Sequence, residues 1–149
     1  MTTTTWLTSG RGRTPARPIL VGVDNPHSSD SFHALYPYPQ GCTGWRIWKM
    51  LNERTGASKQ DYVRAFDRRN LCDLDAFMVP PGSTVVLLGE DVRRWFGLPK
   101  ILIHPQVRDG VTYRQVPHPS GLCRFYNHPA QRELVALLLG QLYEESQDA

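Results

Sequence analysis

The stretch Pro18-Ile19-Leu20-Val21-Gly22-Val23 is a short apolar run that ends in the polar turn Asp24-Asn25-Pro26. A run of this length, made of aliphatic and β-branched side chains, is typical of a buried strand. The stretch Thr84-Val85-Val86-Leu87-Leu88 has the same character and is followed by Gly89. Continuous apolar strands are expected in a parallel sheet that is covered on both faces. The two runs therefore predict an α/β protein.

Helical patterns separate these strands along the chain. Residues 43–54 carry an apolar stripe that stops at Gly56, residues 58–68 begin with a capping sequence, and residues 90–96 start with acidic residues. A last helix is expected from His128 to Tyr143, with Asn127 as its N-cap. Its predicted buried face consists of Leu134, Val135, Leu138 and Leu142.

Further strands are expected at residues 69–72, 101–104 and 111–116, the last two flanking a turn at Arg108-Asp109-Gly110. Together these elements predict a small open, mostly parallel sheet of about four strands with helices on both faces.

Length and composition fit one globular domain. The chain has 149 residues, of which 40% are hydrophobic and 21% are charged, enough for a single core. Residues 1–16 are rich in Thr, Gly and Arg without an apolar period, so we expect a flexible N-terminal arm followed by one domain over residues 17–149. The formal charge of +3 permits contact with nucleic acid without requiring it.

Several classes of protein are disfavoured by the sequence. The apolar stretches are too short to span a membrane, and the start of the chain lacks the pattern of a signal peptide, so we expect a cytoplasmic monomer. The cysteines Cys42, Cys72 and Cys123 are scattered and odd in number, which disfavours a disulfide framework and a four-thiolate metal site. The histidines show no metal-site pairing. We therefore expect no metal and no other cofactor.

Two polar loops are candidates for a functional site. Asn25-Pro26 follows the first expected strand, and His118-Pro119-Ser120-Gly121-Leu122 follows the strand expected at residues 111–116. In open α/β sheets, sites lie outside the carboxyl ends of the strands. The stretch Asn70-Leu71-Cys72-Asp73-Leu74 adds a third polar strand end.

The order and spacing of these motifs resemble the uracil-DNA glycosylase superfamily over most of Ile19 to Leu142. The closing motif of that superfamily, His-Pro-Ser-(Pro or Gly)-Leu, stands unaltered at residues 118–122. Its first motif, Gly-x-(Asn, Asp or Ala)-Pro, is present with one extra residue as Gly22-Val23-Asp24-Asn25-Pro26. The stretch Gly41-Cys42-Thr43-Gly44 is similar to the superfamily's Gly-x-x-Gly entry to the first helix.

The resemblance implies a monofunctional DNA glycosylase that flips a uracil-like or 5-modified pyrimidine out of DNA and hydrolyses its N-glycosidic bond. His118 would donate a hydrogen bond to the departing base, and Asn25 would position the attacking water. The extra residue leaves Asp24 as a rival for the water, because a carboxylate is a better base than an amide.

Base recognition and DNA contact are implied for a second group of residues. Asn70 would read the polar edge of the base, and Tyr38 is preferred over Phe32 and Tyr36 for stacking. His27 follows the motif proline, where it would either exclude a methyl group or bond a polar 5-substituent. The expected DNA contacts are Ser120, Gly121, Leu122 as a wedge, and Arg124 to a phosphate.

Simpler interpretations stay open beside these roles. An Asn-Pro pair after a strand is often only a turn former, Asn70 can bridge backbone at a strand end, and Leu122 can be loop packing. Trp45 and Trp48 have helical spacing and are predicted to be core residues. Two other functions also remain: hydrolysis of a free modified nucleoside or nucleotide, and a non-catalytic module of the same fold that binds modified DNA or protein.

Overall fold

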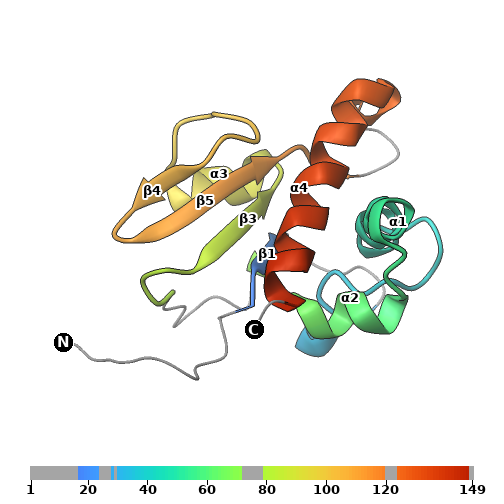
Figure 1. Cartoon of the computed structure of the whole chain (residues 1–149). Coiled ribbons are helices and arrows are strands. Elements are labelled where there is room, and N and C mark those ends of the chain that lie inside the picture. The colour runs from blue at the N-terminus through green and yellow to red at the C-terminus, as the bar shows by residue number, and fades with distance from the viewer. Residues whose placement is uncertain (1–16, 24–27, 29, 72–78, 120–123, 148–149) are drawn as a thin grey trace.

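The computed structural model describes residues 17–23, 28, 30–71, 79–119 and 124–147. These residues form one sheet with strand order β2-β1-β3-β5-β4 (Figure 1). Its strands are β1 (Ile19–Gly22), β2 (Asp67–Asn70), β3 (Thr84–Leu88), β4 (Gln106–Arg108) and β5 (Val111–Val116). Strands β2, β1, β3 and β5 are parallel, and β4 pairs antiparallel with β5. The expected α/β class is confirmed, with five strands in place of about four.

Helices cover both faces of the sheet, as expected. The helices α1 (Thr43–Thr55), α2 (Lys59–Ala65) and α4 (Pro129–Gln147) pack on one face, and α3 (Glu90–Phe96) packs on the other (Figure 1). Two short 3-10 helices, η1 (Ser31–His33) and η3 (Arg124–Asn127), lie in the connections. Within the described ranges, no helix is long and apolar enough to cross a membrane.

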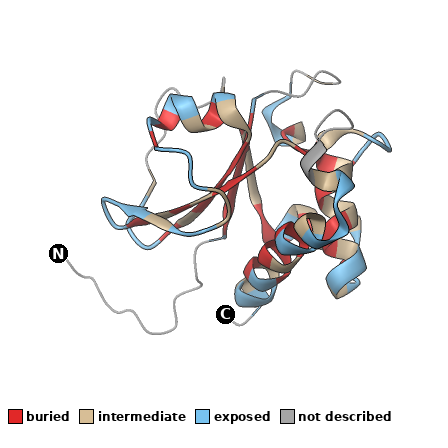
Figure 2. Cartoon of the chain, turned by 90° about the horizontal axis from the view of Figure 1, so that it is seen from above, coloured by how far each residue is buried: buried red, intermediate tan, exposed pale blue. Residues whose placement is uncertain are grey.

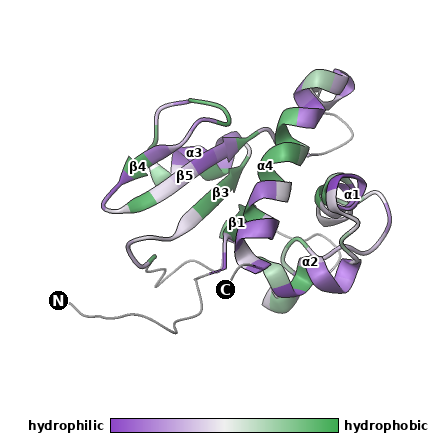
Figure 3. Cartoon of the chain, in the orientation of Figure 1, coloured by the Kyte–Doolittle hydropathy of each residue, from purple (hydrophilic) through white to green (hydrophobic). Residues whose placement is uncertain are grey.

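The core is divided by the sheet into two layers, seen as red on both sides of the strands (Figure 2). Alternate residues of one strand point to opposite faces. In β1, Leu20 therefore packs toward α1 and α4, whereas Ile19 and Val21 pack toward α3. The central strands β1 and β3 are accordingly hydrophobic along their length (Figure 3).

The edge of the sheet differs from the prediction. Residues 101–104 do not form a strand; Leu102 makes a single bridge to Gln115, and Ile103 has a φ of 70°. The edge strand is β4, which a two-residue turn at Asp109 and Gly110 joins to β5. Both turn residues have positive φ, and such a turn fixes the register of the hairpin.

Two boundaries and the burial of one residue also differ from the prediction. The last helix begins at Pro129, whose missing N–H suits the first helical position, and Asn127 belongs to η3 instead of capping α4. Leu134 is 49% exposed, while Val135, Leu138 and Leu142 are buried as predicted. The strand expected at residues 69–72 is β2, two residues earlier, because α2 ends at Ala65.

Gly44 in the first turn of α1 supports the closest backbone approach in this layer. A Cβ at this position would lie 2.2 Å from the carbonyl oxygen of Tyr36 and 2.3 Å from that of Leu35. These backbone atoms cannot move aside as a flexible side chain can, so an added Cβ would displace α1. We expect Gly44→Ala to lower the free energy of unfolding by about 2 to 3 kcal/mol, measured by denaturant titration.

Gly140→Ala is the matched control, since Gly140 is also helical and buried. Its added Cβ would meet the Arg54 side chain at 3.1 Å, which can move aside. This variant should be neutral or stabilising by up to about 1 kcal/mol, because alanine favours a helix over glycine. Equal losses for the two variants would contradict the close approach at Gly44.

Candidate active site at the carboxyl edge of the sheet

The parallel strands bring four polar chain segments to one edge. Gly22 at the end of β1 is in register with Asn70 at the end of β2, and Leu88 of β3 is in register with Val116 of β5. Because β1 and β3 are also parallel neighbours, all four carboxyl ends lie at the same edge. In doubly wound sheets this edge is where ligands bind. Asn70 and His118 therefore belong to the same end of the molecule.

His118 lies two residues beyond β5, in a half-buried position. It lines a cavity of about 300 Å³ formed by residues at the ends of β3 and β5 and at the start of α3. The other lining residues are Gly89, Glu90, Arg93, Lys100, Leu102, Gln115, Val116 and Pro117. The cavity leaves space beside the imidazole for a small ligand.

Burial lowers the pKa of His118 from its ordinary value of 6.5, and the negative charge of Asp91 opposes this shift in part. Removing a cationic imidazole from water is unfavourable, so the neutral form is preferred. The side chain is then a neutral imidazole near neutral pH. Such a ring donates from one nitrogen and accepts at the other.

The lowered pKa can be measured by an NMR titration of the histidine ring protons. We expect the His118 midpoint to lie below 6.5. Because the unfolded chain takes up this proton first as pH falls, the His118 contribution to stability is present above the unfolded pKa and is lost as pH falls through the folded one. The variant His118→Ala should lose this part of the pH dependence. A His118 midpoint above 6.5 would contradict the burial.

The charges that line the cavity are partly paired. Glu90 forms ion pairs with Arg93 at 2.8 Å and with Lys100 at 3.0 Å. Hydrogen bonds from Arg93 and then Lys100 lower the pKa of Glu90, so its carboxylate stays ionised. Glu90 therefore offsets part of the positive charge of Arg93 and Lys100, while the carboxylate of Asp91 acts on His118 itself.

Asn70 is the second side chain of interest at this edge. It is 5% exposed, and its amide oxygen Oδ1 has no hydrogen-bond partner among the described residues. A buried acceptor without a partner costs about 1 to 3 kcal/mol, so such groups are rare. An amide oxygen of this kind is able to accept a hydrogen bond from a ligand N–H.

Tyr38 lies apart from the His118 cavity. Its ring is 51% exposed and packs under the Lys59 ammonium, which is 4.0 Å from the ring centroid. Together with Tyr36 and residues of α2 it lines a different cavity of about 350 Å³. The structure therefore does not bring the expected stacking residue together with His118. Neither Tyr38 nor Asn70 lines the His118 cavity.

The remaining site predictions lie outside the described residues. These are Asp24, Asn25, His27, Ser120, Gly121 and Leu122, together with the side chain of Arg124.

Two residues near His118 were not singled out from the sequence as part of the site. Gly89 has a φ of 97°, and a Cβ there would lie 3.2 Å from the His118 Cβ. The Tyr126 hydroxyl donates a hydrogen bond of 2.6 Å to the carbonyl oxygen of Pro117, which ties η3 to the strand end. Both contacts position the His118 backbone. The position of Gly89 directly after β3 could have indicated its role from the sequence. The Tyr126 bond to Pro117 is a contact with no local sequence signal.

In the part of the chain that the structure describes, no three His, Cys, Asp or Glu side chains gather closely enough to hold a metal ion. A scan against family models, a search of curated proteins and a search of solved structures found no match to this chain. A functional proposal therefore depends on the residues and their geometry.

Proposed function

We propose that the chain is a monofunctional DNA glycosylase that hydrolyses the N-glycosidic bond of uracil or of a 5-modified pyrimidine after base flipping. The observation that carries the proposal is the buried amide oxygen of Asn70, which has no partner among the described residues and lies at the same sheet edge as His118. A flipped uracil offers a ring N–H from which this oxygen can accept a hydrogen bond. The resemblance of residues 118–122 to the superfamily's closing motif supports the same activity.

The separation of the two strand ends is compatible with one base between them. Strands β2 and β5 lie three positions apart in the sheet, and a strand spacing of roughly 4.8 Å puts their ends about 14 Å apart. That distance has room for the side chains of Asn70 and His118 and a pyrimidine ring. One residue would read the base edge, and the other would stabilise its charge.

The proposed reaction places negative charge on the departing base. As the bond to the sugar breaks, the sugar becomes oxocarbenium-like and the base leaves as an anion. The neutral imidazole of His118 donates a hydrogen bond to the base oxygen on which this charge develops. The oxygen of a water molecule then forms a bond to the sugar carbon. The proton that this water loses is taken up by the released base.

Base release from defined oligonucleotides tests the proposal. The full chain is incubated with duplex and single-stranded oligonucleotides that carry uracil, thymine or 5-hydroxymethyl pyrimidines, and abasic sites and free base are measured by mass spectrometry. Release from DNA supports the proposal. Release from monomers alone indicates a nucleoside or nucleotide hydrolase, and binding without release indicates a non-catalytic module; either result overturns it.

The choice between Asp24 and Asn25 as the water-positioning residue is also testable. We expect Asn25→Ala to slow the single-turnover rate more than Asp24→Ala, because Asn25 directly precedes the motif proline. Misplacing a reacting group can cost roughly a hundredfold in rate. The opposite order of the two rates would assign the water to Asp24.

A further inference from the structure

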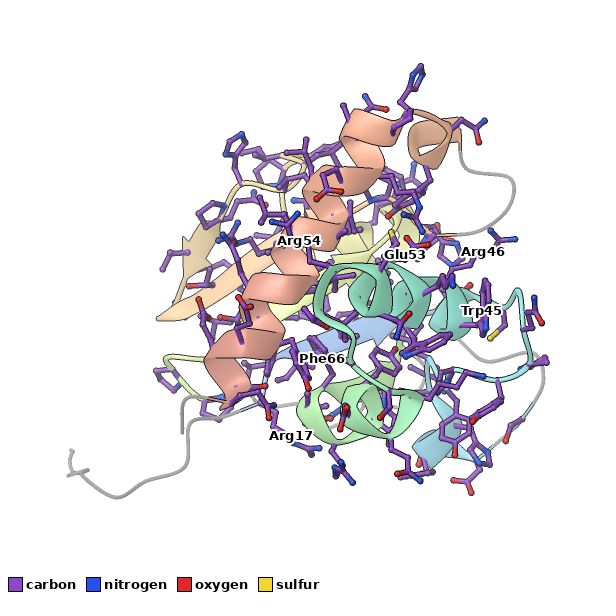
Figure 4. The ribbon with its side chains drawn as sticks, turned by 45° about the vertical axis from the view of Figure 1, so that its right-hand side comes forward. Arg17, Trp45, Arg46, Glu53, Arg54 and Phe66 are labelled. Atoms are coloured by element: carbon purple, nitrogen blue, oxygen red, sulfur yellow. The ribbon has the colours of Figure 1, made fainter. Side chains whose placement is uncertain are left out.

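A third pocket is lined by residues of α1, η3 and α4 and by Pro119, which follows His118. It has a volume of about 80 Å³ and is lined by Trp45, Arg46, Lys49, Met50, Pro119, Tyr126 and Arg132. Figure 4 shows Trp45 and Arg46 projecting from the N-terminal end of α1, away from Arg54 at its other end. Three of the seven lining side chains are cationic.

The charge of this pocket is only partly neutralised. Arg132 pairs with Glu53 at 2.5 Å across α1 and α4. Arg46 donates its Nε–H to the carbonyl oxygen of Gly41 at 2.9 Å, which leaves its charge uncompensated. Neither Arg46 nor Lys49 has an ion-pair partner among the residues that the structure describes. The positive charge of Arg46 and Lys49 therefore favours the binding of an anion.

The shape and neighbours of the pocket favour a phosphate over other anions. Its volume suits a compact group, and guanidinium and ammonium donors are the usual protein partners of phosphate oxygens. Trp45 and Tyr126 supply aromatic rings beside the cations, a combination typical of single-stranded nucleic-acid sites. Pro119 connects the pocket directly to His118.

We propose that Arg46, Lys49 and Arg132 form a phosphate site for the strand that carries the target base. This inference rests on the proposed function, since Pro119 places the pocket beside the proposed reaction centre. The phosphate belongs either to a DNA backbone or to a free nucleotide. Arg46, Lys49 and Arg132 lie on α1 and α4 and are not among the DNA contacts expected from the sequence, which are residues 120–122 and Arg124.

Binding of a fluorescein-labelled oligothymidylate, followed by fluorescence anisotropy over a series of salt concentrations, tests the site. The variant Arg46→Gln/Lys49→Gln should bind about tenfold or more weakly, and the slope of log affinity against log salt should fall by roughly 0.7 for each phosphate that the protein no longer neutralises. The matched control Arg54→Gln/Arg94→Gln removes the same charge from the other end of α1 and from α3. It should retain most of the affinity and the original slope.

Competition by inorganic phosphate and by deoxyuridine monophosphate identifies the source of the phosphate. If the oligonucleotide binds through the pocket and the monophosphate competes weakly, the ligand is a DNA backbone. If only the monophosphate binds in a manner that depends on Arg46 and Lys49, the ligand is a free nucleotide. Equal weakening by the two double variants would overturn the site, because net charge alone would then explain the binding.

Two further measurements separate the site from folding and from catalysis. Lys49→Gln alone, which leaves the Arg46 bond to Gly41 intact, should still weaken binding, with thermal unfolding as the check on the fold. A chain that releases base but binds equally well with and without the two cations refutes the site and keeps the glycosylase. A chain that releases no base but binds through them keeps the site and refutes the glycosylase.

Discussion

Replacement of His118 by alanine is expected to slow base release by about a hundredfold to a thousandfold while leaving the fold intact. This is the range observed when one preorganised donor to a developing oxyanion is removed. His118 is half-buried beside a cavity, and its lowered pKa keeps it a neutral donor at pH 7. The single-turnover rate on a uracil-containing oligonucleotide is the measurement, because it reports the chemical step without product release.

The control for this variant is His104→Ala. His104 is an exposed histidine before the edge strand β4 and does not line the His118 cavity. Its replacement should leave the single-turnover rate within a factor of about two, as expected for a surface position. If His118→Ala retained a rate near that of the unaltered chain, His118 would have no part in the chemistry.

Local patterns predicted the parts of the fold that have strong local causes. The capping box at Ser58 and Asp61 begins α2, and the apolar runs at residues 19–22 and 84–88 form the two central strands. The edge strand was misplaced because residues 101–104 are as apolar as a strand, whereas Val107 in β4 is 71% exposed. Pairing with β5, set by the turn at Asp109 and Gly110, decided that edge.

The buried face of α4 also could not be predicted fully from the local pattern of apolar residues. Leu134 and Val135 are adjacent apolar residues, and the pattern placed both on the buried face. The buried residues of α4 are Val135, Ala136, Leu138, Leu139, Gly140 and Leu142, and at about 100° per residue Leu134 lies just outside the arc that they cover. Which of the two neighbours faces the core depends on how α4 packs on the sheet.

The candidate site was likewise predicted from the sequence only where local motifs indicated it. Asn70 ends β2 and His118 follows β5, and the parallel order of these strands puts both residues at the edge that the sequence motifs indicated. Tyr38 lies apart from this edge because it packs under Lys59 of α2, with which it lines another cavity. The basic pocket of Arg46, Lys49 and Arg132 joins residues about eighty positions apart, so no local pattern indicates it.

Replacement of Asn70 by leucine is expected to separate activity from stability. The two side chains are close in size, and leucine would replace a buried amide oxygen that has no partner among the described residues. Base release should fall by up to roughly tenfold on both duplex and single-stranded DNA, because a neutral hydrogen bond to the base contributes about 0.5 to 1.5 kcal/mol. The free energy of unfolding should stay the same or rise, since the desolvation cost of the oxygen is removed.

Asn52→Leu provides the opposite combination. The Asn52 amide donates a 3.0 Å hydrogen bond to the carbonyl oxygen of Ala57, so its loss should lower stability by about 1 kcal/mol without affecting base release. Denaturant titration and single-turnover rates on the same samples distinguish the two variants. An Asn70→Leu protein that unfolds more readily but releases base at the original rate would make Asn70 a structural residue. A buried amide oxygen that lacks a partner among the described residues, despite its cost to stability, is what we expect of a residue that binds a base.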